Sequence, residues 1–215
     1  MQITIREPGS ALTHFIAMIM AMLGAMPLLI KVSSGLNMTH IGAITIFLIS
    51  MILLYTASTL YHSINLSGWK LKIFKKIDHM MIFVLIAGTY TPICIIALDG
   101  PTGYILLSVV WGIAIAGIVF KLFWVTCPKW VSSVLYIGMG WACISVFGRL
   151  WTALSAPAFW WLLIGGIIYT IGGVIYALKL TIFNSKHKYF GSHEIFHIFV
   201  MVGSLCHFIC MFFIV

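Results

Sequence analysis

The chain has 215 residues, of which 62% are apolar and only 7% are charged, and its net charge is +8. A soluble domain is about 45–50% apolar and roughly one quarter charged, so this composition excludes a soluble enzyme and a disordered tail. It also excludes a nucleic-acid-binding domain, because Lys and Arg lie in short segments between long apolar runs. The sequence therefore indicates an integral membrane protein.

Seven apolar runs are long enough to cross a bilayer as helices, which takes about 20 residues. No strand-like alternation is present, which disfavours a barrel, and the first run lacks the cleavage site of a signal peptide. We expect an all-α bundle of seven transmembrane helices forming one domain over residues 1–215, with a bend at Pro92. The runs are Ala11–Ile30, Ile41–Tyr61, Met80–Leu98, Gly103–Phe120, Val131–Gly148, Ala158–Leu178 and Ile195–Val215.

The basic residues predict the orientation of the bundle. Cytoplasmic loops of membrane proteins carry an excess of Lys and Arg, and here ten basic residues fall on one side of the spans and two on the other. The N terminus is therefore expected in the cytoplasm and the C terminus outside. The ten are Arg6, Lys70, Lys72, Lys75, Lys76, Lys121, Lys129, Lys179, Lys186 and Lys188; the two are Lys31 and Arg149.

Ionisable residues gather in one layer of the predicted bundle. His62 ends the second span, Asp78 opens the third, His193 and His197 begin the seventh, and His14 lies one turn into the first. Ionisable groups at membrane depth are costly and usually face the bundle interior. Although a single histidine at this depth is usually only an interfacial polar group, the set as a whole is a functional signal.

The spacing within this layer favours a metal site. His193 and His197 are four residues apart and share one helix face, and Ser58 has the same spacing to His62, so its hydroxyl can bond the imidazole. Three histidines leave a fourth tetrahedral position for water, as in catalytic zinc (Zn²⁺) sites. Asp78 can then hold that water and accept its proton.

Other candidate ligands are interpreted as structural. His79 is expected at the interface, pointing away from Asp78, and His207 as a hydrogen-bonded core histidine about 15 Å deeper than His197. Cys206 and Cys210 are one turn apart, but core packing is favoured over a metal pair.

One motif resembles that of a zinc protease. His193-Glu194-x-x-His197 matches H-E-x-x-H, in which the glutamate is the general base, and Asp99-Gly100 resembles a motif of intramembrane proteases. The motif order is reversed, however, and the topology places Asp99 on the opposite side of about 30 Å of hydrocarbon. The protease interpretation is therefore disfavoured.

Motifs along the whole chain resemble those of the hemolysin III family, the bacterial branch of the progestin and adiponectin receptor (PAQR) group. They are Ser58-Thr59-Leu60-Tyr61-His62, Asp78-His79, Ala87-Gly88-Thr89-Tyr90-Thr91-Pro92 and His193-x-x-x-His197, with Glu7 and His14 near the start and Gly203-Ser204-Leu205-Cys206-His207-Phe208 near the end. The resemblance implies a seven-helix bundle with zinc near the cytoplasmic face. It also implies His62, His193 and His197 as ligands, with Asp78 contacting the metal-bound water and Ser58 alongside.

Three functions remain open. The resemblance suggests a multi-pass cell-membrane protein that acts on or senses membrane lipids, as a zinc hydrolase of lipid amides or esters with Asp78 and Ser58 as catalytic residues. The alternative is a sensor or receptor in which zinc is structural. A pore-forming haemolysin ranks lowest, because pores are usually lined by polar rings along their length. Membrane lipids are the expected partners, and the loop from Lys70 to Lys76 is expected to meet anionic head groups.

Overall fold

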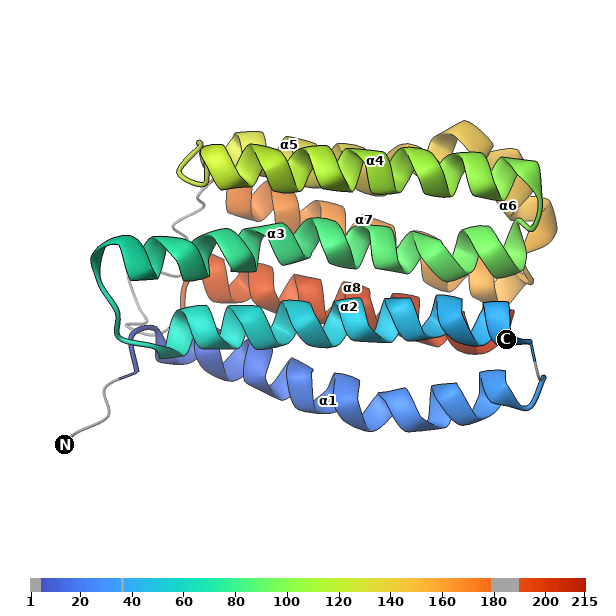
Figure 1. Ribbon diagram of the computed structural model, residues 1–215, viewed down its shortest axis with the longest axis horizontal. Helices are drawn as coiled ribbons and strands as arrows, with labels where there is room; N and C mark the ends of the chain where they lie inside the picture. The colour runs from blue at the N-terminus through green and yellow to red at the C-terminus, as the bar shows by residue number, and fades with distance from the viewer. Residues whose placement is uncertain (1–4, 36, 179–189) are drawn as a thin grey trace.

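The computed structural model describes residues 5–35, 37–178 and 190–215 as a bundle of helices with roughly parallel axes (Figure 1). Within those residues, seven helical segments are long and apolar enough to cross a membrane. α1 begins at the end of the bundle opposite to the one at which α8 ends, as an odd number of spans requires. The helical elements are α1 (Pro8–Ser33), α2 (Met38–Ser63), α3 (Gly68–Pro92), η1 (Ile93–Ala97), α4 (Pro101–Phe123), α5 (Lys129–Gly140), η2 (Trp141–Val146), α6 (Phe147–Ala153), α7 (Ala156–Leu178) and α8 (Ser192–Ile214).

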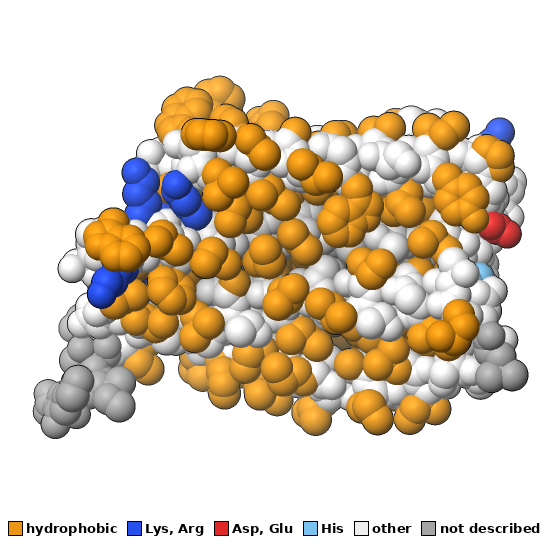
Figure 2. All heavy atoms as spheres, in the orientation of Figure 1, with side chains coloured by type: hydrophobic (Ala, Val, Ile, Leu, Met, Phe, Trp, Pro, Cys, Tyr) orange, Lys and Arg blue, Asp and Glu red, His pale blue; other side chains and the backbone are white. Residues whose placement is uncertain are grey.

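The seven-helix membrane architecture expected from the apolar runs is confirmed. Apolar side chains cover the middle of the surface seen in Figure 2, whereas Lys and Arg gather near its left end. The predicted cytoplasmic side stays a prediction. Three of the lysines on which it depends, Lys179, Lys186 and Lys188, lie outside the described residues.

The third span begins earlier than predicted. The sequence places its start at Met80, but α3 begins at Gly68 and has 25 residues, or about 38 Å at 1.5 Å per residue. This exceeds the roughly 30 Å hydrocarbon core, so its Lys-bearing first turns extend beyond the apolar layer. Asp78 consequently lies on the third turn of the helix and does not open it.

Pro92 marks a change of helix type. The α-helix of the third span ends there, and the π-helical turn η1 follows directly. Proline lacks the N–H that would donate within an α-helix, and a π-turn is one way to continue a helix past such a break.

The fifth predicted span is not one continuous helix. It consists of α5, the 3₁₀ segment η2 and α6. The Tyr90 hydroxyl lies at the break: it donates to the Gly140 carbonyl at 2.6 Å and accepts the Cys143 amide at 3.0 Å. A side chain thereby satisfies backbone groups that the irregular segment would otherwise leave unpaired in an apolar environment.

The helix packing places the candidate site residues on adjacent elements. α1 packs against α2 and α8, α2 against α3, and α7 against α8. At Gly88 of α3, an added methyl group would collide with Ser50 of α2, so this glycine permits the close approach of the two helices. The last turn of α2, the third turn of α3 and the first turns of α1 and α8 therefore meet at one end of the bundle.

Candidate metal centre

Three histidines predicted as ligands lie together at that end. His62 is on the last turn of α2, and His193 and His197 are on the first two turns of α8. One ring nitrogen of each lies within 4.8 Å of the other two. The two Nε2 atoms of His62 and His193 are 3.4 Å apart. Among the described residues, no other group of three or more His, Cys, Asp or Glu side chains converges in this way.

This geometry fits a tetrahedral metal ion. Zinc–nitrogen bonds of about 2.0–2.1 Å at a tetrahedral angle separate two ligand atoms by about 3.3–3.4 Å, which matches the observed separation of His62 and His193. Neutral imidazole is also a ligand that suits zinc. The three histidines therefore can hold an ion with one coordination position left over.

Two of these rings are contacted at Nδ1 by residues at the start of the chain: Glu7, which precedes α1, and Thr13 of α1. The carboxylate of Glu7 contacts His62 Nδ1, and the Glu7 amide donates to the His62 carbonyl at 3.0 Å. The hydrogen bond with His62 holds the pKa of Glu7 below its ordinary value of 4.5, so the group is ionised at neutral pH. The hydroxyl of Thr13 lies 3.1 Å from His197 Nδ1.

The prediction that Ser58 supports His62 is wrong. Ser58 is buried, and its Oγ has no hydrogen-bond partner among the described residues. Glu7 takes the place that the sequence assigned to Ser58, because the segment before α1 crosses the end of α2 directly over His62. Its hydroxyl nevertheless lies close enough to the carboxyl group of Asp78 to interact with it.

Asp78 is buried and lies close enough to His62 and Ser58 for electrostatic interaction. It does not belong to the converging group of three histidines. Asp78 therefore lies beside the histidines, as its predicted role of holding a metal-bound water requires. It does not lie where a fourth metal ligand would.

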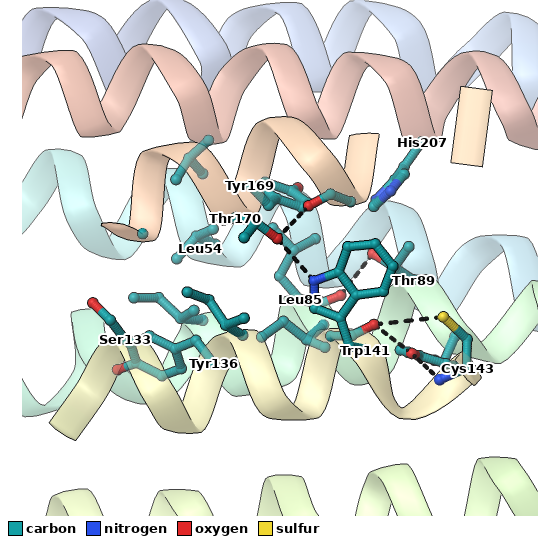
Figure 3. Close-up of a pocket in the computed structure, with 18 of the residues that line it drawn as sticks. Leu54, Leu85, Thr89, Ser133, Tyr136, Trp141, Cys143, Tyr169, Thr170 and His207 are labelled. Atoms are coloured by element: carbon teal, nitrogen blue, oxygen red, sulfur yellow. Dashed lines mark hydrogen bonds between the residues drawn. The ribbon is translucent and has the colours of Figure 1, made fainter. Parts of the chain in front are cut away.

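A cavity of about 160 Å³ extends from the histidines into the bundle. Ser58, Asp78, His193 and His197 line it at one end, and mainly apolar side chains line the rest. Figure 3 shows Trp141 reaching across the cavity, where its indole N–H donates to Thr170 at 2.8 Å. The side chain of His207 points toward the cavity from α8. One water molecule needs a cavity of only about 10–15 Å³, so this cavity can hold a much larger group.

His14 lies in the predicted layer, whereas the position of His79 differs from the prediction. His14 is buried and stacks on His197 with ring centroids 3.6 Å apart, and it supplies no atom to the converging group. His79 lines the cavity, whereas the sequence predicts an interfacial residue. The early start of α3 places this turn inside the bundle.

The remaining candidates supply no atom to the converging group. His207 is buried and its Nε2 lies 3.2 Å from the Leu162 carbonyl, which confirms the hydrogen-bonded core histidine. Cys206 and Cys210 are also buried. Both carboxylate oxygens of Glu194 are engaged, by Ser10 Oγ at 2.5 Å and by the Gly191 amide at 2.8 Å. Asp99 lies between η1 and α4, at the opposite end of α3 from Asp78.

The sequence alone predicts no role for Glu7, Ser10 or Thr13. Their signal was present, since residues 7, 10, 13 and 14 recur at helical spacing on one face. His14 was the only one of them assigned to the layer, because a serine, a threonine and a glutamate at the end of an apolar run are common.

Comparison with known proteins matches residues 2–208 to the family described as Haemolysin-III related. The chain is 38% identical over 209 residues to a Bacillus cereus protein named Hemolysin-3, covering 97% of this chain and 91% of that protein. It is 39% identical over 211 residues to the Hemolysin-3 homolog of Bacillus subtilis (strain 168), covering 98% of this chain and 95% of that protein.

Proposed function

We propose that this chain, which belongs to the haemolysin III family of multi-pass cell-membrane proteins, is a zinc-dependent hydrolase of membrane lipids. It cleaves an acyl amide or ester bond. The observation that carries this proposal is the position of the three histidines at one end of a mainly apolar cavity. Two of them, together with Asp78 and Ser58, line that cavity.

The number of ligands supports a catalytic over a structural ion. Structural zinc sites usually have four protein ligands, whereas catalytic sites have three and an open position. The converging group among the described residues has three members. For the alternative of a sensor with structural zinc, the part of the chain that the structure describes offers no fourth converging ligand.

The side chains around the histidines have the properties that hydrolysis needs. A zinc ion held there supplies a Lewis acid and a water molecule whose pKa is near 7. As the water oxygen adds to the acyl carbon, Asp78 accepts a proton from that water. The Ser58 hydroxyl, which lines the same cavity, donates to the carbonyl oxygen as negative charge develops on it.

The second half of the reaction returns the proton. The bond between the acyl carbon and the amine nitrogen or alcohol oxygen breaks, and the leaving group takes the proton from Asp78. One water is consumed, and one carboxylic acid and one amine or alcohol are formed. The apolar remainder of the cavity provides the environment that an acyl chain requires.

Reconstituted protein tests this proposal directly. Vesicles containing the zinc-loaded chain are incubated with an N-acyl sphingosine and with phosphatidylglycerol, and fatty-acid release is measured by mass spectrometry. We expect release from one of them, and a loss of 10²- to 10⁴-fold in kcat for Asp78→Asn with zinc content unchanged.

Two results would overturn the proposal. One is equal turnover by Asp78→Asn and wild type at equal zinc content. The other is no release from either lipid class by protein that holds zinc. Ser108→Ala, on the lipid-exposed face of α4, is the control and should keep full activity.

A further inference from the structure

A row of polar side chains lies on the first turns of α1 and on the residue that precedes the helix. None of them belongs to the three converging histidines. We name Glu7, Ser10, Thr13 and His14 the α1 polar stripe. α1 is otherwise largely lipid-facing: Leu12, Phe15 and Leu23 are among its exposed residues. The stripe nevertheless touches both helices that bear the three histidines.

Hydrogen bonding along the stripe determines which nitrogen of His197 carries the proton. The Thr13 hydroxyl has one hydrogen, and it donates this hydrogen to the Ser10 carbonyl at 2.9 Å. Toward His197 Nδ1 the same oxygen can therefore only accept. His197 must donate from Nδ1, and its Nε2 keeps a free lone pair.

Glu7 has the same effect on His62. A carboxylate offers only acceptors, and that of Glu7 contacts His62 at Nδ1, so His62 donates from Nδ1. The Nε2 lone pair of His62 then faces His193 Nε2 across 3.4 Å. The backbone bond from the Glu7 amide to the His62 carbonyl holds the two residues in register.

Ser10 fixes the position of α8 relative to the stripe. Its hydroxyl donates to Glu194 Oε1 at 2.5 Å, while Glu194 Oε2 accepts the amide of Gly191. This ties the first turn of α8, with His193 beside Glu194, to α1. His14 then stacks on His197 at 3.6 Å and restricts the ring from the other direction.

We propose that the α1 polar stripe is the positioning element of the metal centre: Glu7 and Thr13 hold His62 and His197 in the Nδ1–H tautomer, so that both Nε2 lone pairs converge. Partners behind a metal-bound histidine typically change metal affinity 10- to 100-fold. The tautomer assignment stands on this geometry alone, whereas the consequence for affinity rests on the metal site of the proposed function.

NMR of the metal-free protein tests the tautomers. The full chain is labelled with ¹⁵N-histidine, placed in lipid nanodiscs and stripped with a chelator, and ring nitrogens are assigned through His62→Ala and His197→Ala. We expect Nδ1–H at both positions. Thr13→Val should abolish this preference at His197 only, Glu7→Gln at His62 only, and Thr13→Ser should restore the wild-type signal.

Zinc affinity, measured by competition with a chromophoric chelator, is the second readout. Glu7→Gln and Thr13→Val should each weaken it 10- to 100-fold, while Thr39→Val, an identical change at the far end of α2, should leave it within twofold. The cobalt-substituted protein should show a shifted visible spectrum for the two stripe variants but not for the control.

The outcomes separate the two proposals. Nε2–H tautomers in the wild type, or tautomers that both stripe variants leave unchanged, overturn the positioning role whether or not metal binds. Stoichiometric zinc whose affinity is unchanged in both variants overturns it as well. Wild-type protein that has the expected tautomers but takes up no zinc overturns the metal site and leaves the tautomer assignment standing.

Discussion

Among the described residues, two of the clusters of polar side chains inside the bundle are partnered in opposite ways. In the histidine triad (His62, His193 and His197), ring nitrogens converge on one another, and a nearby serine hydroxyl has no partner among the described residues. In the tyrosine–serine cluster (Tyr55, Tyr169, Ser204 and His207), both tyrosine hydroxyls bond Ser204, at 2.6 and 2.7 Å, and His207 bonds a backbone carbonyl.

This difference shows what distinguishes a ligand site from a structural one. Both clusters contain buried histidine, so burial alone is not diagnostic. Donors that meet acceptors inside the protein lower the cost of burying polar groups in an apolar medium. Ring nitrogens that converge within 4.8 Å of one another, as in the triad, are placed to share an external ion.

Metal removal should have the largest effect and should separate the clusters. Binding to the folded state alone adds about 4 kcal/mol at a free ligand concentration 1,000-fold above Kd. We expect chelation to lower the Tm of the wild type by several degrees, measured by differential scanning fluorimetry, and to leave His193→Ala unaffected. His207→Gln, whose amide can still donate to Leu162, should keep the full wild-type shift; a shift of equal size in His193→Ala would place the ion elsewhere.

A substitution of the glycine that packs against His207 should have the second-largest effect. An added methyl group at Gly165 would collide with the His207 ring, whereas at Gly166 it meets nothing within 4 Å. Gly165→Ala should lower the free energy of unfolding by about 1–3 kcal/mol, measured by denaturation in detergent, with zinc content unchanged. Gly166→Ala should be neutral, and equal effects of the two would contradict the packing assigned to α7 and α8.

Removing the central hydroxyl of the tyrosine–serine cluster should have the smallest effect. Ser204→Ala leaves the hydroxyls of the buried Tyr55 and the partly buried Tyr169 without their shared partner, and hydrogen bonds between membrane helices average about 0.6 kcal/mol with a maximum near 1.7. We expect a loss in this range by the same denaturation measurement, with unchanged zinc affinity. Reduced zinc affinity would show that the two clusters are coupled.

The sequence predicted the seven-helix architecture well because apolar length is a strong signal in a membrane. It also predicted which histidines meet, because alternating span directions place the end of α2 and the start of α8 in one layer. The early start of α3 was missed, since its first turns carry lysines and contribute little to an apolar run. The break at Trp141 was missed because η2 is as apolar as the helices around it.

The support of the site was predicted poorly. Ser58 was assigned to His62 from spacing within one helix, whereas the actual partner, Glu7, comes from a segment 55 positions away. Such contacts depend on how α1 packs on α2 and α8, which helical periodicity does not encode. The tautomer of His197 depends further on where one hydroxyl hydrogen of Thr13 points.

Zinc stoichiometry tests the central claim most directly. Protein purified without added chelator is analysed by elemental mass spectrometry, with His62→Ala, His193→Ala and His197→Ala beside the wild type and His207→Gln. The account predicts about one zinc per chain in the wild type and in His207→Gln, and almost none in the three alanine variants. Wild-type protein without stoichiometric metal, or alanine variants that retain it, would contradict the account.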